Sequence, residues 1–487
     1  MIDVKVRIHD KFSVEFKTGY VVKKDAKDND FVMNTWIFIP YSLDINSSTY
    51  PKSHFYRDTK SYVRLITPIY SLQEVADSNA LPFMFLQVAF NELVADPSTE
   101  NMAEFEYQIK MFTSIAKSAL RQECDHLIKA QSPEEREVAV DLYLQRIEAI
   151  TSSYRELKQI IEQPGVPEQA LTYFAFGDEF FSNRIEQKTF EVLESLKIDY
   201  PEEYAHLKKK LMGIIQREIE HRLAMGYDVV KKDCPAQNRA LIQRLRLLKK
   251  YIENHLFLDA NRQKDGRLAE QVYFSIAAGV AMIFATTIAF SFQQKYGNFT
   301  MPLFVALVVS YMLKDRIKDL IRFYFANHLS KKYFDNKTVI SIKNRPIGWI
   351  KEGAEFRPGT KVPEEIIKRR GRSDVLESDN RHTEEKIILF RKLVHIDGDA
   401  LYDNNQYDIS GINDIVRFNF SNFIMRMDAP IVPLTIPAEN DDYEIILGEH
   451  IYYINFLIQL KNDHVIEYKR FRVIVSRNGI EGIDRFQ

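Results

Sequence analysis

At 487 residues and 57.1 kDa, the chain is long enough for two or three hydrophobic cores, because single domains usually stop growing near about 250 residues. Its 66 lysines and arginines nearly balance 68 aspartates and glutamates, and the net charge of −2 excludes a protein-wide field that would recruit nucleic acid. Cys124 and Cys234 are too few for a disulfide framework or a thiolate metal site, which favours a reducing compartment. We therefore expect a multi-domain protein without a nucleic-acid partner.

Residues 1–71 are predicted to form a small β-rich unit. Segments such as VKVRI, FSVEF and TWIFI are rich in β-branched and aromatic residues and are separated by charged or proline-containing turns. The first segment alternates polar and apolar residues and lacks the continuous apolar run of a signal peptide. We expect this unit to stay in the cytosol.

Residues 72–258 change to a helical period and predict an antiparallel bundle. Ser132, Pro133 and Glu135 supply an N-cap, a first-turn proline and a capping-box glutamate, and Pro164 ends the helix that they begin. Other helices are expected at 84–96, 99–130, 167–197, 201–226 and 235–258. In the last of these, an apolar seam at spacings of four, three and four predicts a membrane-proximal stalk helix: Leu241, Leu245, Leu248 and Ile252.

Two apolar segments near residues 272–314 predict a transmembrane helical hairpin. Val272 to Phe292 runs for about 21 residues without a charge, enough to span a hydrocarbon core of about 30 Å. Tyr296 to Leu313 gives about 18 residues for a second, slightly short crossing. A hydrophobic hairpin inside a soluble protein is the competing interpretation.

Basic residues on both flanks set the predicted orientation. Arg262, Lys264 and Arg267 precede the first helix and a basic exit helix at 315–334 follows the second, whereas the turn carries only Lys295. This asymmetry predicts two spans in the cell membrane with both termini in the cytoplasm.

Small residues repeat every four positions along both apolar segments: Ala277, Ala281, Ala285 and Ala289 in the first, and Ala306 and Ser310 in the second. Such stripes allow close helix approach, either within the hairpin or between copies in a homo-oligomer. No ionisable residue lies within either apolar segment, so transport by this hairpin alone is disfavoured.

Residues 335–487 are predicted to form an antiparallel β domain, a sandwich or barrel. IYYINFLIQL and VIEYKRFRVIVS read as strands, and Asn478-Gly479 is a strong hairpin signal. Between Pro358 and Arg381, the run KRRGR at 368–372 could bind phosphate or lipid headgroups, but a solvated loop is the simpler interpretation.

The common nucleotide, hydrolase and metalloprotease motifs are absent from the sequence. Glu123 with His126, and Glu218 with His221, repeat the Glu-x-x-His spacing of carboxylate-bridged di-iron bundles. Such a site needs two further glutamates: Glu186 can lie level with Glu218 across the turn near residue 200, whereas Glu92 lies about 27 Å out of level with Glu123. Buried His–Glu hydrogen bonds explain the pairs equally well, and the same spacing at Glu203 and His206 shows how easily it arises by chance.

The acidic run from His395 to Asp403 resembles a calcium loop only superficially, because the EF-hand spacing and terminal glutamate are missing. An Asp-Gly turn between two strands is the better prediction.

The predicted fold is an α+β multi-domain integral membrane protein. Its parts are an N-terminal β unit at 1–71, a helical bundle with a stalk helix at 72–258, a two-helix transmembrane hairpin at 272–314, a juxtamembrane exit helix at 315–334 and a C-terminal antiparallel β domain at 335–487. The leading hypothesis is a non-catalytic, membrane-anchored interaction or scaffold protein whose partners are the lipid bilayer and a protein at the cytosolic face. The alternative is a membrane-associated enzyme with a carboxylate and histidine site in the bundle. The sequence assigns no catalytic or cofactor-binding residue, and we predict no cofactor and no metal.

Overall fold

The computed structural model describes residues 2–23, 26–373, 384–403, 406–437, 442–462 and 465–486. The chain divides into two compact units, one formed by Met1–Arg64, Leu258–Gln406 and Gly411–Gln487, and the other by Leu65–Phe257 and Tyr407–Ser410. The first unit is built mainly of strands and the second of helices, and we call them the β unit and the helical unit. The prediction of a multi-domain α+β protein is confirmed.

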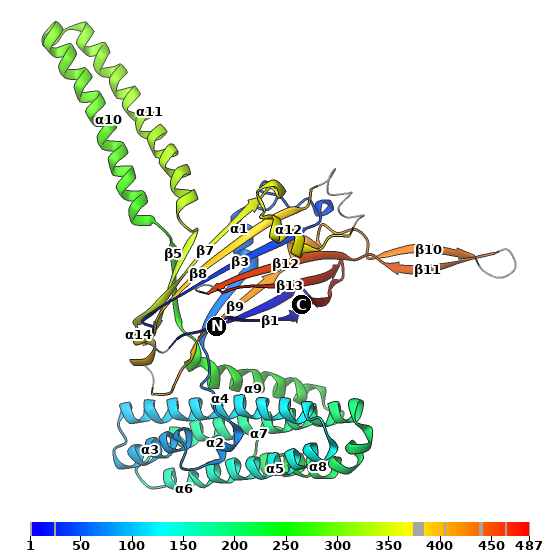
Figure 1. Cartoon of the computed structure of the whole chain (residues 1–487). Coiled ribbons are helices and arrows are strands. Elements are labelled where there is room, and N and C mark those ends of the chain that lie inside the picture. The colour runs from blue at the N-terminus through cyan, green and yellow to red at the C-terminus, as the bar shows by residue number, and fades with distance from the viewer. Residues whose placement is uncertain are drawn as a thin grey trace. The chain divides into compact units, whose positions relative to one another are not determined.

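Two sheets form the body of the β unit (Figure 1). The larger sheet has the strand order β14-β13-β12-β3-β8-β7-β6-β5, and the smaller has the order β1-β2-β9-β4. The strands of the larger sheet are β3 (Asp28–Ile39), β5 (Asp259–Lys264), β6 (Asn336–Ile342), β7 (Arg345–Arg357), β8 (Lys386–Asp397), β12 (Tyr452–Asn462), β13 (Val465–Ser476) and β14 (Gly479–Phe486). Those of the smaller sheet are β1 (Ile2–Asp10), β2 (Ser13–Val21), β4 (Thr59–Leu65) and β9 (Gly411–Asn419).

The N-terminal and C-terminal strands share these sheets. β3 lies between β12 and β8, and β2 pairs with β9. The end of β3, TWIFI, is buried almost continuously, as expected of a central strand that is covered on both faces. Strands from the predicted N-terminal unit and from the predicted C-terminal domain therefore belong to one β unit.

Short helices complete the β unit: η1 (Tyr41–Leu43), α1 (Lys52–Asp58), η3 (Gly359–Lys361), α12 (Glu364–Arg370), α14 (Gly398–Asp403) and α15 (Ser421–Ile424). A separate two-stranded ribbon consists of β10 (Ile431–Pro437) and β11 (Tyr443–Glu449). The expected Asp-Gly turn after His395 is replaced by α14, whose first turn is capped by the Asp397 carboxylate, which accepts the Ala400 amide at 3.0 Å.

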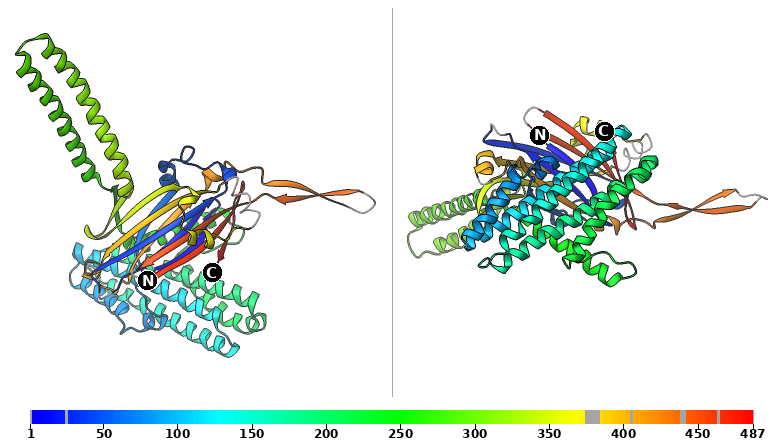
Figure 2. Two further views of the ribbon diagram at one scale, coloured as in Figure 1. Left: turned by 45° about the horizontal axis from the view of Figure 1, so that its top comes forward. Right: turned by 90° about the horizontal axis from the view of Figure 1, so that it is seen from below.

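Long helices lie side by side in the helical unit (Figure 2). The long helices are α3 (Leu81–Ala95), α4 (Thr99–Lys129), α5 (Pro133–Glu156), α7 (Glu168–Asp199), α8 (Pro201–Ala224) and α9 (Pro235–Glu253). Short helices accompany them: α2 (Leu72–Ala76), α6 (Lys158–Ile161) and η2 (Asn254–Leu256). The Ser132 hydroxyl accepts the Glu135 amide at 3.1 Å, so α5 begins at its predicted cap. In α9, Leu248 and Ile252 pack against Phe180 of α7, which makes this seam part of the unit's core.

A hairpin of two long helices, α10 (Arg267–Tyr296) and α11 (Met301–Lys332), leaves the larger sheet between its edge strand β5 and the adjacent strand β6 (Figure 1). Among the described residues, α10 alone is long and apolar enough to cross a membrane by length and composition, which by itself is weak evidence. α11 is not apolar enough over the required length. The predicted second span began at Tyr296, but residues 296–300 belong to the end of α10 and to the turn. Its charge-free part, Met301–Leu313, rises only about 20 Å before Lys314.

Candidate functional site

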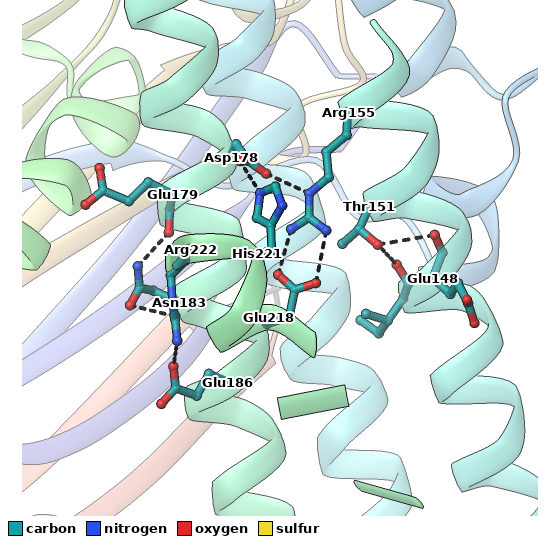
Figure 3. Close-up of polar contacts among 11 residues, drawn as sticks. Glu148, Thr151, Arg155, Asp178, Glu179, Asn183, Glu186, Glu218, His221 and Arg222 are labelled. Atoms are coloured by element: carbon teal, nitrogen blue, oxygen red, sulfur yellow. Dashed lines mark hydrogen bonds and ion pairs between the residues drawn. The ribbon is translucent and has the colours of Figure 1, made fainter. Parts of the chain in front are cut away.

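A network of buried charges joins three helices of the helical unit (Figure 3). Arg155 of α5 donates two hydrogen bonds to the Glu218 carboxylate of α8, at 3.2 and 2.7 Å, and a third to Asp178 of α7 at 3.0 Å. The Nε2 atom of His221 lies 2.7 Å from the other Asp178 oxygen. The Arg155 guanidinium thus pairs with two almost fully buried carboxylates, and the His221 ring contacts one of them.

Two further arginines extend the network along α7. Arg222 of α8, which is 1% exposed, donates to Asn183 at 2.9 Å and pairs with Glu186. Arg244 of α9 donates to both oxygens of Glu179. Each described carboxylate of this cluster therefore has a cationic partner, as buried charges require.

The electrostatics of Asp178 follow from these contacts. Burial alone would raise the pKa of its carboxyl group, but the hydrogen bond from His221 and the charge of Arg155 outweigh burial and lower that pKa below its ordinary value. Asp178 therefore stays ionised at neutral pH. Both oxygens of this ionised carboxylate contact side chains of neighbouring helices, so Asp178 stabilises the packing of α5, α7 and α8.

The sequence candidates for metal binding do not meet. Glu218 and His221 lie together in the network, but their partners are Arg155 and Asp178. Glu123 pairs with Arg146 at 2.5 Å, and His126 is exposed because the buried face of α4 continues onto Cys124 and Leu127. Within the described parts of the chain, no three His, Cys, Asp or Glu side chains are placed to hold a metal ion.

The remaining candidates form ordinary ion pairs. Glu186 does lie near the level of Glu218, as predicted, but it binds Arg222 one helical turn further along α8. Glu203 pairs with Arg136, and His206 lies 2.9 Å from Glu137. Sequence reasoning missed Asp178 and Arg155, although an aspartate on the helical face that carries Phe174 and Phe181 was a signal for a buried polar contact.

The basic run 368–372 is not a solvated loop. It ends α12, and the side chains of Arg370 and Arg372 are 6% and 8% exposed, both directed at Glu385, with nitrogen–oxygen distances of 2.9 Å. The rest of the predicted loop, residues 374–381, lies outside the described residues. The expected solvated loop was therefore wrong for these two arginines.

The α10–α11 hairpin exposes an unusual amount of apolar surface. In α10 only Ala277 and Ala281 are buried among its residues, and in α11 Ala306 and Ser310 are buried. The small-residue stripes thus lie where the two helices pack against each other. Large side chains on both helices remain exposed: Val272, Ile276, Val280, Ile283 and Phe290 in α10, and Phe304, Val305, Val308, Met312 and Leu313 in α11.

The β10–β11 ribbon is a second exposed apolar element. All of its described residues are exposed except the half-buried Gly448, and Leu434 and Leu447 are 54% and 65% exposed. The cross-strand register places Leu434 opposite Ile446 on one face and Thr435 opposite Ile445 on the other, so both faces carry apolar side chains. An isolated two-stranded ribbon is only marginally stable in water.

Neither a family model, nor a curated protein, nor a solved structure matches this chain.

Proposed function

We propose that this chain is a membrane-anchored interaction protein: the α10–α11 hairpin inserts into the lipid bilayer, and the β unit and helical unit act at the cytosolic surface. The observation that carries the proposal is the exposed apolar surface of the hairpin, where Phe290 and Phe304 are 70% and 62% exposed. A soluble monomer rarely exposes a contiguous apolar patch of more than a few hundred Å². A lipid environment removes that cost.

The aromatic and basic residues at the base of the hairpin support the same proposal. Tyr273 stacks on Phe325 with ring centroids 4.7 Å apart, and the Arg322 guanidinium lies 5.3 Å from the Phe274 ring. Aromatic and basic side chains of this kind are typical of the membrane–water interface on the cytosolic side. The polar turn with Asn298 would then lie on the opposite side.

The contact between Tyr273 and Phe325 also fixes the register of the two helices. In this register, charged residues of α11 lie at a depth where a simple transmembrane span would be apolar. Because Tyr273 lies level with Phe325, the charged turn of α11 from Lys314 to Asp319 lies level with the apolar middle of α10. Asp315 and Lys318 form an ion pair at 3.2 Å, but Arg316 and Asp319 are exposed. Charges at membrane depth are costly unless they are paired, so this turn favours contact with another membrane segment.

The β10–β11 ribbon supports a protein partner outside the membrane. Pro433 and Pro437 are an even number of residues apart, so their backbone nitrogens point to the same side of β10. Neither has the N–H group that an added strand would need, and they therefore block the outer edge of β10. The outer edge of β11 carries no proline and offers an unpaired backbone to an added strand. Lipid cannot satisfy those backbone groups, whereas a polypeptide strand can.

Membrane anchoring is tested by alkaline carbonate extraction of membranes from cells that express the full chain. Retention in the pellet is expected for the wild type, and release into the supernatant would refute the proposal. A deletion of residues 267–332 leaves residues 265–266 and 333–335 to connect β5 with β6, an antiparallel neighbour pair, and should give a soluble protein.

Orientation is tested by a membrane-impermeant maleimide on intact cells, in a Cys234→Ser background. Asn298→Cys should react from outside, and Arg262→Cys only after permeabilisation. If Asn298→Cys also reacts only after permeabilisation, the hairpin does not cross the bilayer, and two spans with cytoplasmic termini are wrong.

A further inference from the structure

A cavity of about 560 Å³ lies in the β unit, beside the C-terminal end of α12. Three arginines and one glutamate supply its charged lining: Arg370, Arg470, Arg472 and Glu385. Tyr41, Tyr452 and Tyr453 add aromatic residues to the lining, and Asn455 is a further polar lining residue. The cavity is thus basic, partly aromatic, and much larger than a single phosphate ion.

The fold brings these residues together from distant parts of the chain. Arg472 and Asn455 face each other in the β12–β13 register, with Phe38 of β3 on the other side of Asn455. α12 packs over the same face of the sheet through Ile366, which contacts an apolar cluster that includes Phe38 and Leu457. Arg370, the last residue of α12, is thereby held above Asn455 and Arg472.

Among the residues that the structure describes, positive charge is in excess in this cavity. Glu385 is already engaged by Arg370 and Arg372, and Arg472 binds Asp484 at 2.6 Å. Arg470 has no carboxylate partner among the described residues; its guanidinium stacks on Phe486 at 4.2 Å and reaches only the Gly371 carbonyl at 3.5 Å. Burial lowers the pKa of Arg470, and the like charges of Arg370 and Arg472 lower it further. A bound anion would relieve this repulsion.

Asn455 supplies an independent observation. Its side chain is buried, with 1% of the residue exposed, and neither Oδ1 nor Nδ2 has a hydrogen-bond partner within the described structure. Leaving a buried polar group unpaired costs about 1–3 kcal/mol, so native proteins seldom do so without a reason. Asn455 is one of the residues that line the cavity, and it lies opposite Arg472 in the β12–β13 register.

We propose that this cavity binds the phosphate group of an organic phosphate, with the Arg470 guanidinium and the Asn455 amide as its principal donors. Arginine forks match phosphate oxygens in geometry and charge. The remaining volume and the exposed rings of Tyr41 and Tyr453 accommodate the organic part. The ligand is either a soluble phosphate ester or the headgroup of an anionic lipid, since both present the same group.

The test uses the full chain in detergent micelles and the thermal unfolding of the β unit, followed by the fluorescence of Trp36 and Trp349. Inorganic phosphate at 10 mM should raise the unfolding temperature relative to chloride of equal ionic strength. Arg470→Gln and Asn455→Asp should each weaken phosphate binding about tenfold or more. Lys469→Gln removes the same charge from the neighbouring residue of β13, which bonds Asp3 rather than the cavity, and should behave like the wild type.

Absence of a phosphate effect on the wild type would overturn the proposal, as would an effect that persists in both cavity variants. If Arg470→Gln unfolds the β unit by itself, Asn455→Asp decides, because it keeps the shape of the side chain and adds one negative charge. The two sources are then separated by comparing glycerol 3-phosphate with dioctanoyl phosphatidic acid. Stronger protection by the first assigns a soluble ester, and by the second a lipid headgroup.

Discussion

Replacing the buried Lys392 by methionine should destabilise the β unit. Lys392 of β8 is 0% exposed; it lies 2.8 Å from Glu352 on the neighbouring strand β7 and also pairs with Asp414 on β9 of the other sheet. Lys392→Met keeps nearly the same volume but leaves two buried carboxylates without their cation. Removing one partner from a buried ion pair costs about 3–5 kcal/mol, and we expect the lower end because Arg262 still lies 3.5 Å from Glu352.

Urea unfolding followed by tryptophan fluorescence measures this change. The chain has two tryptophans, Trp36 in β3 and Trp349 in β7, so the signal reports on the β unit alone. The difference in the free energy of unfolding between Lys392→Met and the wild type should be smaller at pH 5 than at pH 7.5. The reason is that an unpaired buried carboxyl group has a raised pKa and is protonated more easily as the pH falls. Lys386→Met, at the start of the same strand, is the matched control and should change stability by less than about 0.5 kcal/mol. A loss below about 1 kcal/mol for Lys392→Met at pH 7.5 would refute the reasoning.

Three further predictions concern the other parts of the molecule. Burial raises the pKa of the Cys124 thiol to about 12, so this thiol should be unreactive in the native chain. Mass spectrometry after maleimide treatment at pH 7.5 should show one adduct on the native chain, at Cys234, and two adducts in urea. Two adducts on the native chain would contradict the packing of α4. Asp178 has a folded pKa below its ordinary value near 3.8, so its stabilisation is present above that value and is lost as the pH falls through the folded pKa. Asp178→Asn should therefore cost about 2 kcal/mol at pH 7 and flatten the acid limb of helical-unit stability measured by circular dichroism, and an unchanged acid limb would assign the loss to other groups. Ala277→Leu overpacks the α10–α11 contact and should slow disulfide formation between cysteines placed at positions 273 and 325. Val280→Leu, at an exposed position of α10, is the control and should not slow it. Equal rates in the two variants would show that Ala277 does not face α11.

Local patterns predicted the elements but not their partners. The caps of α5, the long helices and most strands follow from periodicity and turn residues, because these signals act within a few residues. The position of β3 between β12 and β8 depends on contacts between residues at least 347 positions apart in the sequence, which no local pattern carries. The strand β5 was missed because DANRQK is polar, and it forms an edge strand in which every residue is exposed.

The alternation of side chains between the two faces of β8 could have predicted that Lys392 is buried. In KIILFRKLVHID, the positions Ile388, Phe390, Val394 and Ile396 share one face of the strand, and Lys392 falls on the same face. A lysine among four buried apolar neighbours needs an acidic partner from another strand. The sequence therefore did contain a signal for the buried ion pairs of Lys392. It could not say which acid, because Glu352 and Asp414 reach Lys392 through two different sheets.

The hairpin was predicted in outline and misjudged in detail for a related reason. Counting apolar residues from Tyr296 treats the turn as part of a span, whereas Gly297 at a φ of +77° ends α10 and sets where α11 can begin. Its base is fixed to the sheet: Asp265 accepts the Phe334 amide at 3.2 Å and pairs with Lys351 at 3.4 Å, so the strands β5 and β6 continue directly into the two helices. If the hairpin inserts into a bilayer as proposed, a partner that binds the charged turn of α11 could act on the β unit through the paired strands β5 and β6, which continue from the two helices.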